Sequence, residues 1–425
     1  MSPTFRSLRN HNYRLYATGG VVSNTGTWMQ RVAQDWLVVL LAHNDGVALG
    51  ITTGLQFLPA LLLSPYAGLV ADRMPKLRLL KITQSVMAVT ALLLGALAVT
   101  GTVQVWHVFV LALVFGVGSA FDAPARQSFV SEMVGTDDLS NAVGLNSASF
   151  NAARLAGPAI AGLLIGLFGG GVEATGWVIV INGFSYGAVL LALRAMVPAD
   201  LHTPEREPRH KGQIRDAIRY LRGRPDLMLI LCVVGFAGTF GLNFQMTSAL
   251  MATQVFHKGA TEYGLLGSIM AIGSLTGALM AARRTRIRLR LVVGAALAFG
   301  VVEIAAGLMP SYAAYALIVP LLGFTALTMI TAANTTMQLA TAPALRGRVM
   351  ALYLMVFMGG TPIGSPFIGW LGEQFGARWT LIAGGGLTIL GVLGAAAIFT
   401  RGRTLLERRV VVQEARDEEP VGSLA

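Results

Sequence analysis

Long apolar stretches alternate with short polar connections along nearly the whole chain. Each stretch covers about 18 to 27 residues, and a helix needs about 20 apolar residues to cross the hydrocarbon core of a bilayer. The stretches lie at residues 15–41, 48–71, 79–100, 105–122, 142–168, 174–197, 226–251, 261–282, 291–309, 312–337, 348–372 and 378–400. The pattern predicts an all-α polytopic membrane protein with twelve transmembrane helices.

Composition excludes the alternative of several soluble domains. The chain has 425 residues, of which 54% are apolar and only 12% are charged. Soluble domains average about 25% charged residues. The 50 glycines suit membrane helices that pack backbone against backbone.

The distribution of basic residues sets the orientation. A net charge of +11 would fit a nucleic-acid partner, but the charges lie in short clusters between apolar stretches. With a cytoplasmic N-terminus, 28 of the 32 Lys and Arg residues are on the inside, whereas only Lys258 and Arg378 are outside. This asymmetry predicts a multi-pass protein of the plasma membrane with both termini in the cytoplasm and no nucleic-acid partner.

Several classes of chemistry have no motif in this chain. No lysine belongs to a phosphate loop ending in Gly-Lys-Ser/Thr, and the six histidines follow no metal-binding spacing. The single cysteine, Cys232, excludes an intrachain disulfide, and the arginines near the N-terminus lead into a full-length span rather than a cleavable signal. We therefore expect no enzyme activity, metal or cofactor, and an ion gradient as the energy source of any uphill transport.

The two halves of the chain resemble each other. A shift of 207 residues places Leu145 on Leu352, Gly157 on Gly364 and Gly162 on Gly369, all in one register. Two pseudo-symmetric six-helix halves of this kind occur in one large class of transporters. The predicted boundaries are 1–197 for the first half, 198–225 for a cytoplasmic linker, 226–400 for the second half and 401–425 for a disordered tail.

The linker contains a short amphipathic pattern. Ile214, Ala217, Ile218 and Leu221 fall on one stripe of a helix over 213–222, with arginines elsewhere around it. The pattern predicts a helix on the cytoplasmic leaflet of the lipid bilayer; a partly ordered linker is the alternative.

The connection after the second span resembles the signature of the major facilitator superfamily. Gly68, Asp72, Arg73 and Lys76 match that signature, while Pro75 replaces its second glycine. The resemblance implies the major facilitator fold and a cytoplasmic gate, in which the Asp lies against the N-terminus of the eleventh helix. It also implies an ion pair between Lys76 and Asp122. The alternative to a gate is that these residues only supply positive-inside charge and a proline in the turn.

The fifth span resembles the antiporter motif of the same superfamily. Gly144, Gly157, Pro158 and Gly162 match it, whereas Ala161 and Ala153 replace two of its glycines. The motif implies export by proton exchange, and an ordinary proline kink is the alternative. Ala112 occupies the place of an arginine found in many exporters, which argues against a proton relay in the fourth span.

Three further stretches resemble the macrolide-efflux and enterobactin-exporter-like branch of this superfamily. They begin at Leu8, Ser23 and Phe121, and the likeness covers roughly residues 5–400.

The first span has the densest polarity within the membrane. Arg31 and Asp35 lie one helical turn apart on one face, and either would be costly alone in lipid, so we expect them to face each other or a wet cavity. Desolvation favours the protonated carboxyl of Asp35 and pairing with Arg31 favours the carboxylate, so the pair is a candidate proton site; a permanent structural ion pair is the alternative. Arg154 and Glu303 are further proton-coupling candidates.

Other polar and aromatic residues of the spans are candidates for lining an amphiphilic cavity. We select Trp28, Gln34, Phe240, Asn243, Phe244 and Asn334. The same residue types also serve in ordinary packing and in contacts with lipid.

Together these patterns favour a monomeric secondary exporter of hydrophobic or amphiphilic small molecules, coupled to protons through alternating access. Uptake, facilitation, and movement of a lipid-like substrate between leaflets are alternatives within the same fold. A membrane enzyme or sensor is disfavoured, since the chain lacks a catalytic cluster and an added soluble domain.

Overall fold

The computed structural model describes residues 3–202, 213–282, 289–342 and 345–417, and the regular structure in these residues is helical. The first part of the chain forms η1 (Pro3–Arg9), α1 (His11–Leu41), α2 (Gly46–Arg73), α3 (Lys76–Val99), α4 (Val105–Met133), α5 (Thr136–Leu167), α6 (Val172–Ala195) and η2 (Pro198–Asp200). The second part forms α7 (Gln213–Arg222), α8 (Pro225–Phe236), η3 (Ala237–Gly241), α9 (Phe244–Leu250), η4 (Met251–Val255), α10 (Ala260–Ala282), α11 (Leu289–Gly307), α12 (Tyr312–Ala340), α13 (Arg346–Gly359), α14 (Thr361–Phe375) and α15 (Ala377–Asp417).

Polar side chains mark the beginnings of several helices. The Asp45 carboxylate accepts hydrogen bonds from the backbone N–H groups of Val47 and Ala48 at 2.7 and 3.2 Å, which caps α2. The turn before it needs positive φ at His43 and Asn44. Such a tight turn brings α2 back antiparallel to α1.

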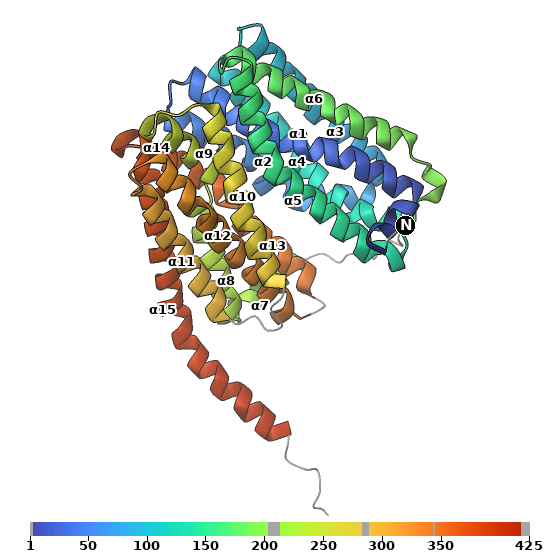
Figure 1. Ribbon diagram of the computed structural model, residues 1–425. Helices are drawn as coiled ribbons and strands as arrows, with labels where there is room; N and C mark the ends of the chain where they lie inside the picture. Colours follow the sequence, from blue (N-terminus) through green and yellow to red (C-terminus); the bar gives the residue numbers. More distant parts are fainter. Residues whose placement is uncertain (1–2, 203–212, 283–288, 343–344, 418–425) are drawn as a thin grey trace, which may run out of the picture.

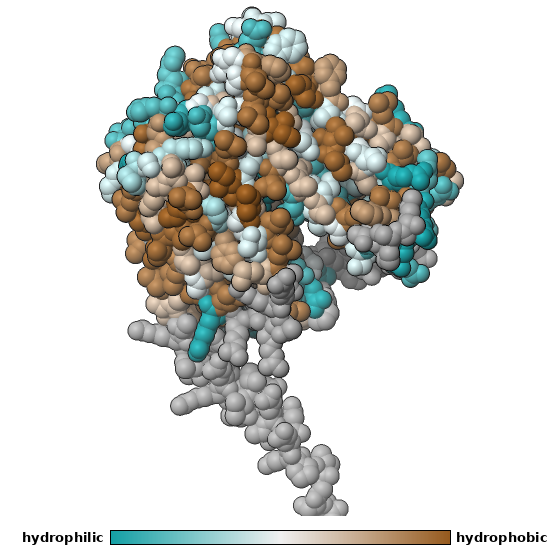
Figure 2. Space-filling model, in the orientation of Figure 1, coloured by the Kyte–Doolittle hydropathy of each residue, from teal (hydrophilic) through white to brown (hydrophobic). Residues whose placement is uncertain are grey.

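Eleven helical segments of the described residues are long and apolar enough to cross a membrane. Figure 2 shows hydrophobic side chains over much of the flank of the bundle, and Leu317, Phe184 and Ile398 are among the exposed ones. The expected all-α polytopic class is therefore confirmed. α1 has 31 residues and is the remaining long helix; its polar residues, including Arg31 and Asp35, lower its hydropathy.

The helices form two groups that meet along two pairs of helices. In the first group, α1 packs against α5 and α6, and α4 packs against α2 and α3. In the second, α12 packs against α10 and α11, and α15 packs against α8 and α11. The pairs α2 with α14 and α5 with α10 join the groups, which lie together at one end and apart at the other (Figure 1).

Two segments differ from the sequence prediction. α7 forms at the predicted range, but Ala217 and Leu221 are buried in a cluster shared with α8 and α13, so protein covers part of the stripe assigned to the leaflet. α15 continues beyond residue 400 to Asp417, so the prediction of a disordered tail is wrong for 401–417. The reason is that no proline follows Gly402 until Pro420, outside the described residues.

Candidate functional site

A cavity of about 310 Å³ lies between the two groups of helices. Helices α1, α2 and α5 form one wall, and the end of η3, the turn after it and helices α9 to α14 form the other. Its lining is Trp28, Arg31, Val32, Thr53, Phe57, Arg154, Pro158, Gly241, Leu242, Asn243, Phe244, Gln245, Met246, Tyr263, Gly267, Met270, Ala271, Phe299, Leu322, Ala326, Leu327, Ile330, Phe357 and Thr361.

Two arginines share one indole ring in this cavity. The guanidinium carbon of Arg31 lies 4.9 Å from the ring centroid of Trp28, and that of Arg154 lies 5.6 Å from the same ring. Arg31 also lies 5.8 Å from the ring of Phe57. Cation–π contacts of this kind are stronger where water is excluded. The structure thus brings Arg154 of α5 beside Arg31 of α1.

Asp35 has a different partner from the one expected. Its carboxylate accepts a hydrogen bond of 3.0 Å from the Tyr263 hydroxyl on α10, and both side chains are buried. Among the described residues it has no ion pair with Arg31. Of the two expected arrangements, a direct pair and side chains that face a cavity, Arg31 adopts the second. The reason is that Arg31 extends toward Trp28 while Tyr263 reaches Asp35 from the other group.

Glu303 is buried on α11, where one of its carboxyl oxygens, Oε2, has no hydrogen-bond partner. A Cβ placed on Gly241 would lie 3.0 Å from Oε2, and a Cβ placed on Gly384 would lie 3.0 Å from Oε1. The hydroxyl of Thr388 is also buried without a partner near Gly241. The second group therefore holds a buried carboxyl group between α11, η3 and α15.

The cavity candidates from the sequence separate into two sets. Trp28, Asn243 and Phe244 line the cavity, whereas Gln34, Phe240 and Asn334 are not in its lining. Gln34 is buried among the helices. The Phe240 ring packs 5.9 Å from that of Phe367. Asn334 accepts a hydrogen bond of 2.5 Å from Gln338.

Asn243 supports the break between η3 and α9. Its amide donates to the carbonyl oxygens of Thr239 and Phe240 at 3.0 and 3.2 Å, and its carbonyl oxygen accepts from Ser365 at 2.6 Å. These bonds satisfy backbone oxygens that the broken helix leaves free. The bond with Ser365 also links the broken helix to α14. Asn243 therefore lines the cavity and also stabilises the backbone around it.

The two groups touch closely at the end formed by residues 46–54 of α2. A Cβ on Gly50 would lie 2.4 Å from the carbonyl oxygen of Ser365, and one on Gly46 would lie 2.6 Å from that of Gly369. Glycines also allow close contact between α5 and α10, because a Cβ on Gly264 would lie 2.3 Å from the carbonyl oxygen of Pro158. Small residues thus let both helix pairs meet backbone against backbone.

The other ends of the same helices are open. A Cβ on Gly68 of α2 or on Gly144 of α5 would have no heavy atom within 4 Å. Figure 2 shows an open notch between the two groups at this end. Asp72 and Arg73 lie exposed at the end of α2 here. The two groups therefore meet at the ends of α2 and α5 that contain Gly50 and Gly162, and they lie apart at the ends that contain Gly68 and Gly144.

Of the four matches to the antiporter motif, Pro158 and Gly162 pack against α10 at the contact between the groups, whereas Gly157 packs against α1 and Gly144 lies at the open end. Gly157 faces Trp28, since a Cβ there would lie 2.6 Å from the Cβ of Trp28. Gly162 lies against the backbone of α10. One turn away, the Ala159 N–H donates a hydrogen bond of 3.1 Å to the hydroxyl of Ser268. The motif therefore connects the arginine pair with the contact between α5 and α10.

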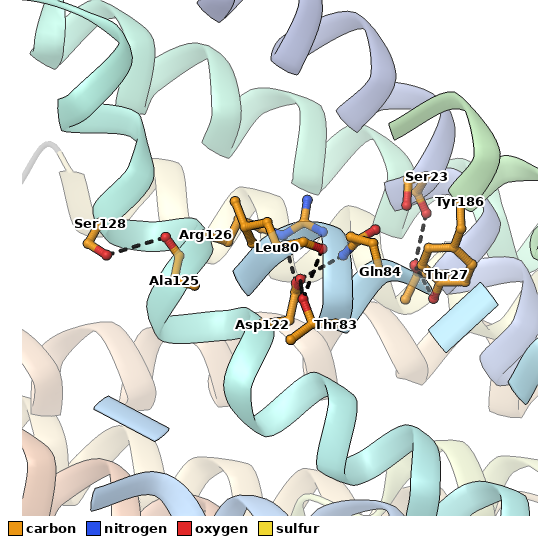
Figure 3. A network of polar contacts seen from close by, with 10 residues as sticks. All are labelled: Ser23, Thr27, Leu80, Thr83, Gln84, Asp122, Ala125, Arg126, Ser128 and Tyr186. Carbon is orange, nitrogen blue, oxygen red and sulfur yellow. Dashed lines mark hydrogen bonds and ion pairs between the residues drawn. The ribbon is translucent and has the colours of Figure 1, made fainter. Parts of the chain in front are cut away.

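Charged residues near the end of α2 that contains Asp72 form two networks within the first group. Lys76 pairs with Glu132, not with Asp122 as the family resemblance implied. Asp122 instead binds Arg126 at 3.0 Å, Thr83 at 2.8 Å and Gln84 at 2.7 Å (Figure 3). The correction follows from helix geometry: Asp122 lies ten positions before Glu132 on α4, about 15 Å from the end that Lys76 reaches.

Tyr263 is the site residue that the sequence did not reveal. Nothing in its local pattern, Glu262-Tyr263-Gly264, distinguishes it from other tyrosines in apolar spans, and its partner Asp35 lies 228 positions away. In the described parts of the chain, no three His, Cys, Asp or Glu side chains gather at a metal-binding spacing.

A family model described as transmembrane secretion effector matches residues 2–415. The multidrug efflux pump Tap of Mycolicibacterium fortuitum is 27% identical over 391 residues, which cover 89% of this chain and 93% of that protein. The enterobactin exporter EntS of Shigella boydii is 23% identical over 85% of this chain and 86% of its own. The staphyloferrin A transporter of Staphylococcus aureus is 33% identical, but the match spans only 34% of this chain and 36% of that protein.

Solved structures share the fold at low identity. A bacterial homolog of the human lysosomal transporter Spinster, in an inward-facing and occupied conformation, superposes with a TM-score of 0.70 at 18% identity. That match covers 93% of this chain and 98% of the other. A D-xylose–proton symporter superposes with a TM-score of 0.68 at 13% identity, covering 91% and 96%.

Proposed function

Because the chain belongs to the transmembrane secretion effector family of the major facilitator superfamily, we propose that it exports hydrophobic or amphiphilic small molecules in exchange for protons. Relatives named as a drug efflux pump and as a siderophore exporter support the direction of transport and the breadth of the substrate class. The cavity supports the same class, because its wall combines aromatic rings with a few charged and polar groups.

The observation that carries this proposal is the position of the cavity between two helix groups that touch at one end only. Helix pairs α2 with α14 and α5 with α10 meet through glycines at the outer end, and Gly68 and Gly144 face open space at the inner end. Rocking of one group against the other would close the inner end and open the outer one, which is alternating access. In this proposal α1 is the twelfth span, the groups are two six-helix halves, and one chain is the functional unit.

The proton carriers that we propose are Asp35 and Glu303. Both are buried carboxyl groups, one at the contact between α1 and α10 and the other between α11 and α15. An isolated carboxylate in such a site is costly, so each group is suited to bind a proton in one access state and release it in the other. Arg31 and Arg154 are the basic groups nearest to the cavity wall.

Proton release from everted membrane vesicles tests the proposal. Respiration acidifies these vesicles, a pH-sensitive dye reports the acidity, and a panel of unlabelled antibiotics and siderophores is added one compound at a time. We expect at least one compound to release protons from vesicles with the protein and not from vesicles without it. Uptake of a compound that carries protons in the same direction, or transport with no proton movement, would contradict proton-coupled export.

A further inference from the structure

The cavity carries positive charge without a matching acidic group. Arg31 and Arg154 both line it, and none of the other lining residues is Asp or Glu. Both guanidinium groups lie against the Trp28 ring, so two like charges share a small space. The wall therefore carries two positive charges, and its lining contains no carboxylate that would neutralise them.

The hydrogen-bonding state of Arg31 points to a missing partner. Its Nε is buried and has no hydrogen-bond acceptor. The acidic residue one turn away, Asp35, is engaged by the Tyr263 hydroxyl at 3.0 Å. Among the described residues, neither Arg31 nor Arg154 forms an ion pair with a carboxylate.

Buried guanidinium groups without a countercharge are costly, and the cost rises when two of them are close. Ring contacts with Trp28 and Phe57 offset part of it but supply no acceptor for the N–H groups. A carboxylate or similar oxyanion would supply both the charge and the acceptors, and guanidinium groups bind such anions with paired hydrogen bonds.

The rest of the wall selects what is attached to the anion. Phe57, Phe244, Phe299, Leu322 and Met270 give the cavity an apolar and largely aromatic surface. A small, fully charged anion would leave this surface in contact with water. An anion joined to an apolar or aromatic body would cover it.

We propose that the substrate is an amphiphilic organic anion, whose oxyanion group binds between Arg31 and Arg154 while its apolar body lies on the aromatic wall. This inference rests on the proposed export function and narrows its substrate class. The inference also distinguishes between the two proposed proton carriers. A bound anion favours the protonated form of the nearby Asp35, so anion and proton would bind together there. Exchange requires instead that proton and substrate exclude each other. Glu303, on the second group, is then the carrier that exchanges with the anion.

Binding of three matched naphthalene probes tests the inference directly. 1-Naphthylacetate, 1-naphthylacetamide and 1-naphthylethylammonium share the ring and differ in charge, and their affinities are measured by equilibrium dialysis with the full chain in phosphatidylcholine nanodiscs. We expect the anion to bind roughly 10- to 100-fold more tightly than the other two, as charge-assisted hydrogen bonds to a buried arginine would give.

Variants of the arginines assign this preference to the cavity. Arg31→Gln and Arg154→Gln should each remove most of the preference for the anion and leave the affinity for the amide unchanged. Arg290→Gln, which removes the same charge at an exposed position outside the cavity, should change neither. Arg31→Lys keeps the positive charge and should retain part of the preference for the anion. This variant provides the test if Arg31→Gln does not fold.

A lipid headgroup could offer the same oxyanion chemistry as a soluble substrate, so the measurement is repeated with phosphatidylglycerol in the nanodiscs. Competition by this lipid that disappears in Arg31→Gln would assign the site to a lipid phosphate, and its absence would assign the site to soluble anions. Equal affinities for the three probes, or an unchanged preference in both glutamine variants, would overturn the inference. If a neutral or cationic compound then still released protons in the vesicle assay, the proposed export function would be supported while the anion preference would be rejected.

Discussion

Gly264 on α10 offers a perturbation of the outer contact with a predictable size. A Cβ at this position would lie 2.3 Å from the carbonyl oxygen of Pro158 and 2.9 Å from the Cα of Gly162. Both neighbours are backbone atoms, so α5 and α10 must move apart in Gly264→Ala. Overpacking of this kind costs about 1–3 kcal/mol.

In the proposed alternating-access cycle this cost applies to the inward-open state, because the outer ends of α5 and α10 would separate when the cavity opens outward. A change of about 1–3 kcal/mol shifts the balance between two states by roughly 5- to 150-fold. The helix propensity gained by replacing Gly with Ala is common to both states and cancels. Gly264→Ala should therefore shift the population toward outward-open.

Labelling of the cavity measures the shift. In a Cys232→Ser background, Thr53→Cys places a thiol in the cavity wall, and a membrane-impermeant maleimide added outside reacts with it only in the outward-open state. The labelling rate should rise in Gly264→Ala and stay unchanged in Gly294→Ala, where an added Cβ meets no atom within 4 Å. Equal rates in the two variants would refute the assignment of the α5–α10 contact as the outer gate.

The remaining predictions concern orientation, the inner gate and the proton carrier. Cysteines at Lys258 and Arg346, both exposed, should react with an external impermeant reagent at the first position only; external labelling at 346 would contradict the topology. Asp72→Asn removes the negative charge that the N-terminus of α13 would favour when the inner gate is closed. A loss of about 1–2 kcal/mol of this stabilisation should shift the balance between the two access states roughly 5- to 30-fold toward inward-open. Unchanged maleimide access to the cavity would argue against this gate. Glu303→Gln should abolish substrate accumulation driven by a pH gradient while sparing downhill exchange, whereas the same phenotype in Asp35→Asn alone would assign the carrier to Asp35.

The sequence predicts the helices well because their signal is local. Apolar stretches long enough to span a bilayer and the segregation of basic residues are both properties of consecutive residues. The break in the seventh span was not predicted, since η3 and α9 are stabilised by Asn243 and its partner Ser365, 122 positions away. The helical continuation of α15 was missed for another reason: a polar composition was read as disorder although no proline interrupts residues 401–417.

The candidate site was predictable only in part. Polar residues in an apolar helix, such as Arg31 and Asp35, are conspicuous and were selected for that reason. The hydrogen-bond partner of Asp35 comes from another helix. Helical spacing alone suggested a contact between Asp35 and Arg31, whereas in the folded chain the Tyr263 hydroxyl binds Asp35. The pairing of Lys76 with Glu132 rather than Asp122 has the same origin, because motif resemblance does not specify the depth at which two helices meet.

The most direct test of the central claim is accumulation of a labelled substrate against its own gradient. A compound that releases protons in the vesicle screen is supplied in radiolabelled form to proteoliposomes that contain the purified chain with its cytoplasmic end outward and an acidic interior. Export in exchange for protons predicts that the internal concentration rises above the external one and collapses when a protonophore removes the pH gradient. Equilibration to equal concentrations, with or without the gradient, would contradict proton-driven export.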